Sequence, residues 1–138
     1  MAYWLLKTEP STYSWDNLVS DKKTVWEGVA NPAALKNIRS MKKGDLALIY
    51  HTGDERQAVG IAEIISDSYP DPKDKSGKLV VMDIRPKHKL GRPVTLHEIK
   101  QDPAFAAWDL LRISRLSVVP TSKEIWDRVE RLSRSEPE

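Results

Sequence analysis

Cysteine is missing from the sequence, and phenylalanine and histidine are scarce, with one and three copies in 138 residues. Without cysteine, the chain has no disulfide framework, no thiolate zinc site and no cysteine nucleophile. The three histidines stand at positions 51, 88 and 97, and this spacing does not suit a set of metal ligands. We therefore expect no metal and no other cofactor.

Long apolar runs are missing as well. No stretch of the sequence approaches the ~20 apolar residues that a membrane-spanning helix needs. The first residues do not resemble a signal peptide, so a cytoplasmic protein is expected. With 40% hydrophobic and 30% charged residues, the 138-residue chain is long enough to bury the core of one domain. We expect a single domain over residues 1–138, with a frayed end at 133–138.

The motifs of common catalytic sites are a third absence. The sequence has no Gly-x-Ser-x-Gly elbow, no phosphate-binding loop, no Rossmann glycine pattern and no His-Glu-x-x-His pair. Tyr50 and His51 are suited to acid–base chemistry, but nothing in the sequence places a nucleophile beside them. A non-catalytic protein is therefore expected. The alternative is an enzyme that acts on nucleotides or RNA with His51 as its general base.

The excess of positive charge is small, because the net charge is +2 and the isoelectric point is near 8.8. Such a balance does not suit a protein that coats nucleic acid electrostatically. Basic residues nevertheless cluster in two segments, and six of them are candidates for phosphate contacts. They are Lys36, Arg39, Lys42, Lys43, Arg85 and Lys87. The alternative is that these residues only solvate the surface.

Apolar patterning predicts about five strands interleaved with short helices. The expected strands cover residues 3–7, 45–51, 57–66, 79–87 and 115–119. Pro86 is expected to place the far end of the fourth strand at an edge of the sheet, and Pro120 is expected to close the last strand. The expected helices begin after Ser14, Asn31, Thr95, Asp102 and Thr121. The helix after Asn31 is expected to run to Lys43, where Gly44 breaks it.

The strands at 3–7 and 45–51 are apolar on both faces, which is typical of central strands. Gly60, inside the third strand, indicates a bend or a close approach of the backbone to its neighbours. The regular crossover helices of a doubly wound sheet are missing. The sequence therefore predicts an α+β fold, built on a closed or nearly closed mixed β barrel with short helices around it.

Trp26 stands just before a predicted helix start, with Asn31 as the N-cap and Pro32 as the first helical residue. The free N–H groups of such a start, next to a flat ring, suit a ligand with an anionic and an aromatic part, such as a nucleotide. Tyr50 and Tyr69 also fall at strand ends or loops, so three aromatic rings are available to sandwich an unstacked base. The alternative is that Trp26 is a core residue.

Seven separated blocks of the sequence resemble the EVE domain. They are Tyr3–Pro10, Trp26–Asn31, Met41–Leu46, Tyr50–His51, Val59–Glu63, Tyr69–Pro72 and Arg115–Val118. The resemblance implies a PUA-like pseudobarrel of five or six strands, related to YTH domains. It also implies a pocket for a modified base that is flipped out of DNA or RNA.

Matching positions imply roles for individual residues. Trp26 would be a wall of an aromatic cage, and Asn31 a polar residue of the pocket. The other matching blocks bring to the pocket, or to the strands around it, Tyr50, His51, Tyr69, Asp71, Lys7, Glu9, Arg115 and Ser117.

The chain departs from the family pattern at the helix start. Ala30 stands where the family usually has arginine, and Ala33, Leu35 and Lys36 replace a glutamine, an arginine and an asparagine. The expected function is a non-catalytic module that captures a methylated or hydroxymethylated base of DNA or RNA. The missing polar groups keep a further alternative open, a protein-interaction module whose pocket has degenerated.

Overall fold

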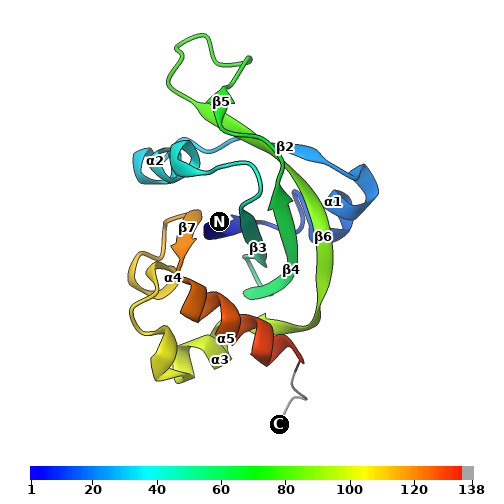
Figure 1. The fold of residues 1–138 in the computed structure, drawn as a ribbon, viewed down its shortest axis with the longest axis vertical. Helices are drawn as coiled ribbons and strands as arrows, with labels where there is room; N and C mark the ends of the chain where they lie inside the picture. The colour runs from blue at the N-terminus through cyan, green and yellow to red at the C-terminus, as the bar shows by residue number, and fades with distance from the viewer. Residues whose placement is uncertain (135–138) are drawn as a thin grey trace.

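A computed structural model describes residues 1–134, in which a strongly curled sheet is surrounded by helices (Figure 1). The hydrogen-bonded order of the strands is β2-β6-β4-β3-β1-β7, and β5 pairs with β6 beside this path. The strands are β1 (Tyr3–Thr8), β2 (Thr24–Trp26), β3 (Leu46–His51), β4 (Gln57–Ile64), β5 (Tyr69–Pro70), β6 (Val80–Thr95) and β7 (Val118–Thr121). The helices are α1 (Trp15–Asp21), α2 (Pro32–Ser40), α3 (Leu96–Gln101), the 3-10 turn η1 (Pro103–Phe105), α4 (Asp109–Arg112) and α5 (Lys123–Arg134).

The middle of the sheet consists of the strands that are apolar on both faces. β1 lies between β3, to which it runs parallel, and β7, to which it runs antiparallel. Leu5 and Leu6 point to opposite sides of β1, and both are fully buried. The predicted central position of β1 and β3 is therefore confirmed, and so is the predicted α+β fold.

Helix α2 spans the open side of the curled sheet, where it contacts both β7 and β6 (Figure 1). The Asn37 Nδ2 group donates to the Val118 carbonyl oxygen at 2.8 Å, and Arg39 donates to the Lys78 carbonyl oxygen at 3.0 Å. Ala34, Leu35 and Ile38 turn inward from the same helix. The sheet is thus a half-barrel that a helix completes.

The prediction that Pro120 closes the last strand was wrong, because β7 continues through it. The edge position predicted for Pro86 agrees with the described strand pairs, which give β6 a partner on one side only at this residue. Pro86 lies inside β6 opposite Ala62, at a shift in the register with β4. On the other side of β6, the described pairs with β2 and β5 reach no further than Ile84. Pro120 lies inside β7, the last strand of the sheet. Proline is tolerated in such edge strands and bulges, since no ladder hydrogen bond is lost there.

Three helix boundaries also differ from the prediction. Helix α2 ends at Ser40, because Met41 is extended (φ −71°, ψ 146°). The helix expected after Asp102 is divided into η1 and α4. Helix α5 is capped by Ser122, whose hydroxyl accepts the Ile125 N–H at 3.2 Å, and not by Thr121, whose hydroxyl accepts from the Trp108 ring.

Helix α5 extends beyond Ser133, where the sequence predicted fraying. Ser133, placed in a frayed segment by the sequence, is buried within α5. That helix is described to Arg134, and residues 135–138 lie outside the described residues.

Gly60 provides the close approach that the sequence indicated. A Cβ atom at this position would lie 2.6 Å from two carbon atoms of the Trp15 ring. The indole ring at the start of α1 therefore packs directly on the backbone of β4.

We expect Gly60→Ala to lower the free energy of unfolding by about 1–3 kcal/mol, because the added methyl group forces the Trp15 ring outward. Urea unfolding measures this loss. In a Trp15→Leu background the same change should cost clearly less, as a double-mutant cycle shows. Equal losses in both backgrounds would contradict the direct contact.

Candidate functional site

A cavity of about 660 Å³ opens where β1 and β2 end and the chain turns into α2. We call it the central cavity. Five of the site residues predicted from the sequence line it, namely Lys7, Glu9, Trp26, Asn31 and Ser117. The other lining residues are Thr8, Thr12, Tyr13, Thr24, Val25, Glu27, Gly28, Val29 and Ala30.

Trp26 belongs both to the core and to the wall of the central cavity. The residue is 8% exposed, and its strand, β2, pairs with β6. The Tyr13 ring meets it edge-on, with ring centroids 6.3 Å apart and planes at 79°. The Tyr13 hydroxyl donates to Asp21 at 2.8 Å, and burial raises the pKa of Tyr13. Sequence reasoning missed Tyr13, which lies in a turn with no apolar periodicity around it.

Asn31 caps α2 as predicted. Its Oδ1 atom accepts the N–H groups of Ala33 at 2.9 Å and Ala34 at 3.1 Å. Gly28 has a φ of +83°, which lets the chain turn between Trp26 and the helix. Because the oxygen of Asn31 is occupied by the cap, its NH₂ group is the part that can donate to a ligand.

Lys7 and Glu9 bring opposite charges to the central cavity. The Lys7 ammonium donates to the Ser114 carbonyl oxygen at 2.9 Å, and burial lowers the pKa of Lys7. Glu9 lies over Gly53, where an added Cβ would come within 3.0 Å of its carboxylate. The Lys7 backbone N–H donates to the carbonyl oxygen of Ser117 at 2.9 Å, which holds Ser117 beside the end of β1.

Tyr50 faces a different hollow of about 280 Å³, which we call the flanking hollow. Lys7 lines both this hollow and the central cavity, so it forms the wall between them. Tyr50 itself is buried, and burial raises its pKa to about 12.

Tyr69 and Asp71 line a third hollow, of about 310 Å³, which shares Thr24, Val25 and Glu27 with the central cavity. A hydrogen bond from the Tyr69 hydroxyl to Asp83 holds the ring and raises the pKa of Tyr69 to about 12. The structure thus does not bring the rings of Trp26, Tyr50 and Tyr69 into one cage. It pairs Trp26 with Tyr13 instead.

His51 is buried beneath α1 and does not line the central cavity, although it pairs with Thr8, which does. Its Nε2 atom accepts the Trp15 backbone N–H at 3.0 Å, so its Nδ1 atom carries the proton and donates to Glu55 at 2.9 Å. A register shift between Ile49 and Tyr50 lets both Tyr50 and His51 be buried. With both ring nitrogens engaged, His51 holds the first turn of α1 against β3.

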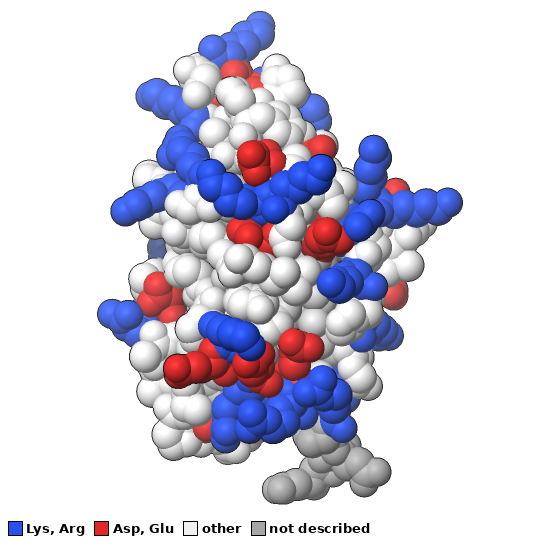
Figure 2. Space-filling view, in the orientation of Figure 1, with Lys and Arg blue, Asp and Glu red and all other residues white. Residues whose placement is uncertain are grey.

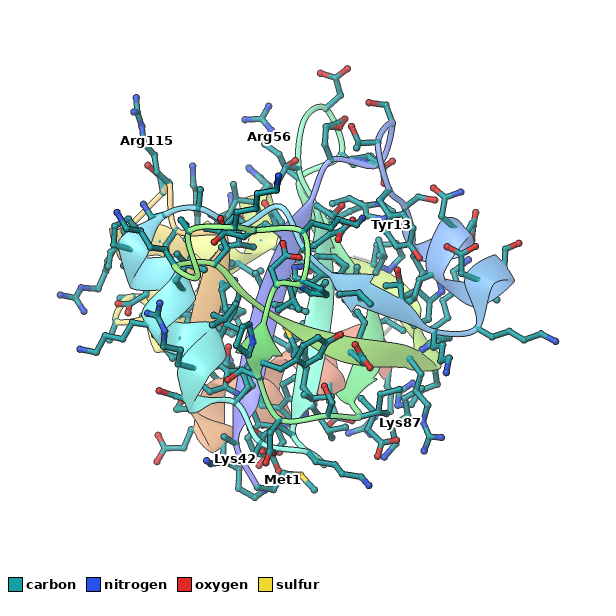
Figure 3. The ribbon with its side chains drawn as sticks, turned by 90° about the horizontal axis from the view of Figure 1, so that it is seen from above. Met1, Tyr13, Lys42, Arg56, Lys87 and Arg115 are labelled. Carbon is teal, nitrogen blue, oxygen red and sulfur yellow. The ribbon has the colours of Figure 1, made fainter. Side chains whose placement is uncertain are left out.

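Arg115 is exposed in the loop before β7 and is not a strand residue. The six candidates for phosphate contacts are exposed too, but they do not gather around the central cavity. Figure 3 shows Lys42 and Lys87 on the same side as Met1, where β1 begins, and Arg56 and Arg115 on the opposite side. Arg85 pairs with Glu63 at 2.8 Å. In Figure 2, acidic and basic groups are interspersed over the visible face.

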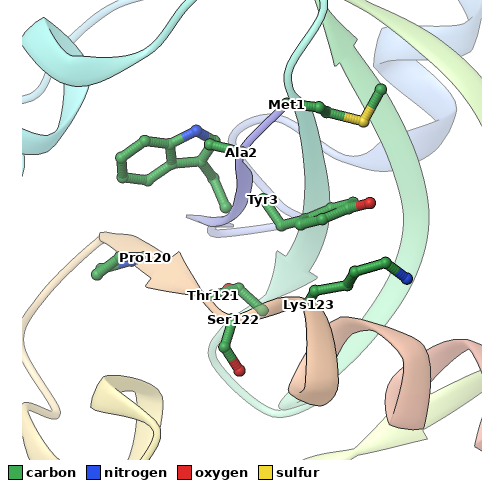
Figure 4. A pocket seen from close by; sticks show the side chains of 8 residues that line it. Met1, Ala2, Tyr3, Pro120, Thr121, Ser122 and Lys123 are labelled. Atoms are coloured by element: carbon green, nitrogen blue, oxygen red, sulfur yellow. The ribbon is translucent and has the colours of Figure 1, made fainter.

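A further hollow of about 640 Å³ lies at the start of β1 (Figure 4). It is lined by Met1–Trp4 and Pro120–Lys123, and it includes none of the predicted site residues. Within residues 1–134, no group of three His, Asp or Glu side chains is arranged to hold a metal ion. No helix in that range is long and apolar enough to cross a membrane.

The family model of the EVE domain matches residues 2–132. The chain belongs to the EVE family. A protein from Rhodopseudomonas palustris, whose structure was determined by NMR, is 44% identical to this EVE domain. The two structures have a TM-score of 0.92, and the match covers 96% of this chain and 93% of the other.

Human thymocyte nuclear protein 1 is 27% identical over 170 residues, which cover 99% of this chain and 76% of the human protein. The crystal structure of the human protein in complex with DNA that contains 5-methylcytosine has a TM-score of 0.91 with this EVE domain, with 99% and 100% of the two chains covered.

A YTH domain from Zygosaccharomyces rouxii has a TM-score of 0.59 at 18% identity, covering 99% of this chain and 87% of the other. This likeness concerns the fold alone. The predicted similarity in fold to YTH domains is confirmed.

We expect His51→Leu to reduce the free energy of unfolding by about 1–3 kcal/mol, because the buried Trp15 N–H loses its acceptor. Urea unfolding, followed by far-UV circular dichroism, measures the loss. Glu55→Gln is the control, since a glutamine oxygen still accepts from His51. An unchanged unfolding midpoint for His51→Leu would refute the structural role of this histidine.

Proposed function

We propose that this EVE domain binds a modified base of DNA or RNA in the central cavity and catalyses no reaction. The observation that carries the proposal is the open cavity of about 660 Å³, walled by Trp26 and Tyr13 at the start of α2. Pockets of this size and mixed lining commonly hold small ligands. The human relative with a closely similar fold has been crystallised with DNA that contains 5-methylcytosine, which supports the same ligand class.

The lining of the central cavity suits a nucleobase. Contact with the Trp26 ring would contribute about 1–3 kcal/mol if the base stacks on it. The Glu9 carboxylate can accept from an exocyclic amino group, and the ammonium group of Lys7 can donate to a ring carbonyl. Val29 and Ala30 add an apolar wall, which fits a methyl group on the base.

Two observations weigh against the alternatives. Because both nitrogens of His51 are bonded within the protein, it is poorly suited to act as a general base. The central cavity is open although Ala30 replaces the usual arginine of the family, which disfavours a degenerate pocket. Cytoplasmic localisation stays a prediction; the human relative carries the word nuclear in its name.

The decisive substitution is Ala30→Trp, which fills the central cavity from an exposed loop position. We expect at least a tenfold loss of affinity for a single-stranded DNA that carries one 5-methylcytosine, with an unchanged unfolding midpoint. Fluorescence anisotropy of the labelled strand measures the affinity. Trp26→Ala is a poorer test, because removing a buried tryptophan costs about 3–5 kcal/mol of stability by itself.

Ala106→Trp is the matched control, since Ala106 is exposed and outside the central cavity. It should bind the methylated strand as the unmodified protein does. If Ala30→Trp also binds as before, the base does not enter the central cavity and the proposal is refuted.

A further inference from the structure

The flanking hollow lies next to the central cavity and has a lining of its own. It lies directly beyond Lys7, between the loop after β3 and the segment from α3 to α4. Its lining consists of Lys7, Tyr50, Thr52, Gly53, Arg56, Leu96, Lys100, Leu110, Leu111 and Ser114. At about 280 Å³ it is less than half the size of the central cavity, at about 660 Å³.

The charge of the flanking hollow is of one sign. Lys7, Arg56 and Lys100 line it, together with hydroxyl groups, and no carboxylate does. The Glu55 carboxylate, next to Arg56 in the sequence, accepts from His51. The Glu9 carboxylate lies over Gly53 and lines the central cavity. Within residues 1–134, neither Arg56 nor Lys100 forms an ion pair, in contrast to Arg85.

Arg56 is held in an unusual backbone conformation. Its φ is +47°, in the left-handed region of the backbone, which residues other than Gly, Asn and Asp rarely adopt. The carbonyl oxygen of Arg56 accepts the N–H of Leu96, the first residue of α3, at 2.9 Å. This hydrogen bond fixes the backbone of Arg56. The loop thus presents a guanidinium group to the flanking hollow from an anchored backbone.

The position of the flanking hollow fits the path of a nucleic-acid strand. A base in the central cavity leaves its sugar and phosphate at the rim, and Lys7 is the wall that separates the rim from the flanking hollow. Arg56 and Arg115 lie on this side of the molecule, whereas Lys42 and Lys87 lie on the other (Figure 3).

We propose that the flanking hollow binds a backbone phosphate next to the captured base, through Arg56 and Lys100. This inference rests on the proposed function of the central cavity. It assigns the phosphate contact to two residues that are far apart in the sequence, in place of the basic clusters near Lys42 and Lys87. Within those clusters, Arg85 and Arg39 gain less from a phosphate because they already have partners. Lys42 and Lys87 lie on the opposite side of the molecule from Arg56 (Figure 3).

The test compares Arg56→Gln, Lys100→Gln and the double variant with the unmodified protein, after thermal unfolding has shown that each is folded. The first probe is a single-stranded DNA with one 5-methylcytosine, and the second is the nucleoside 5-methyl-2′-deoxycytidine, which has no phosphate. We expect each single change to weaken strand binding about two- to fivefold. Each should also reduce the slope of log affinity against log salt by about 0.7. Nucleoside binding should not change.

Lys42→Gln and Lys87→Gln are the matched controls and should leave strand affinity as it is. The inference is overturned if Arg56→Gln and Lys100→Gln bind the strand with unchanged affinity and salt slope, or if the two controls weaken binding as much. Loss of strand affinity in a protein that ignores methylation and the nucleoside would support the phosphate contact but refute the base pocket. Absence of strand binding by the unmodified protein would refute both.

Discussion

The buried carboxylate of Asp45 joins three parts of the chain at one point. It accepts the Ala2 N–H at 3.0 Å, the Trp4 indole N–H at 3.1 Å and the Lys42 N–H at 2.9 Å. A buried carboxylate is costly unless donors surround it, so these three groups are fixed together. The start of β1, the turn after α2 and the start of β3 are thereby held in register. From this point β1 runs beside β3 and ends at the central cavity.

The central cavity follows from the way the half-barrel is completed. A strand in the gap between β7 and β6 would have continued the backbone hydrogen bonds of the sheet. Helix α2 occupies this gap instead, and the Asn37 side chain donates a hydrogen bond to β7. A helix presents its first turn and the preceding loop to one end of the gap. The loop from Trp26 to Asn31 therefore borders an opening and is not packed against another strand. The flat ring, the helix start and the charges of Lys7 and Glu9 meet there because of that topology.

Local signals in the sequence were sufficient for much of the fold. The caps at Ser14, Asn31 and Thr95 depend on residues within one turn, and each is present in the structure. Pro120 was misinterpreted because whether a strand tolerates proline depends on its neighbours in the sheet, which are distant in sequence. Tyr13 had no detectable signal, since its place beside Trp26 results from the packing of α1 and not from any pattern around it.

The charges of the candidate site, like the position of Tyr13, could not be predicted from local patterns in the sequence. A sequence reveals where basic residues cluster along the chain, but not which of them have acquired partners. Arg85 is neutralised by Glu63 from the adjacent strand, while Arg56, a single cation in a polar loop, remains without an ion pair within residues 1–134. Free positive charge near a cavity is therefore a property of the folded arrangement. In this EVE domain it is provided by separate segments that the parallel pairing of β1 and β3 brings to one end of the sheet.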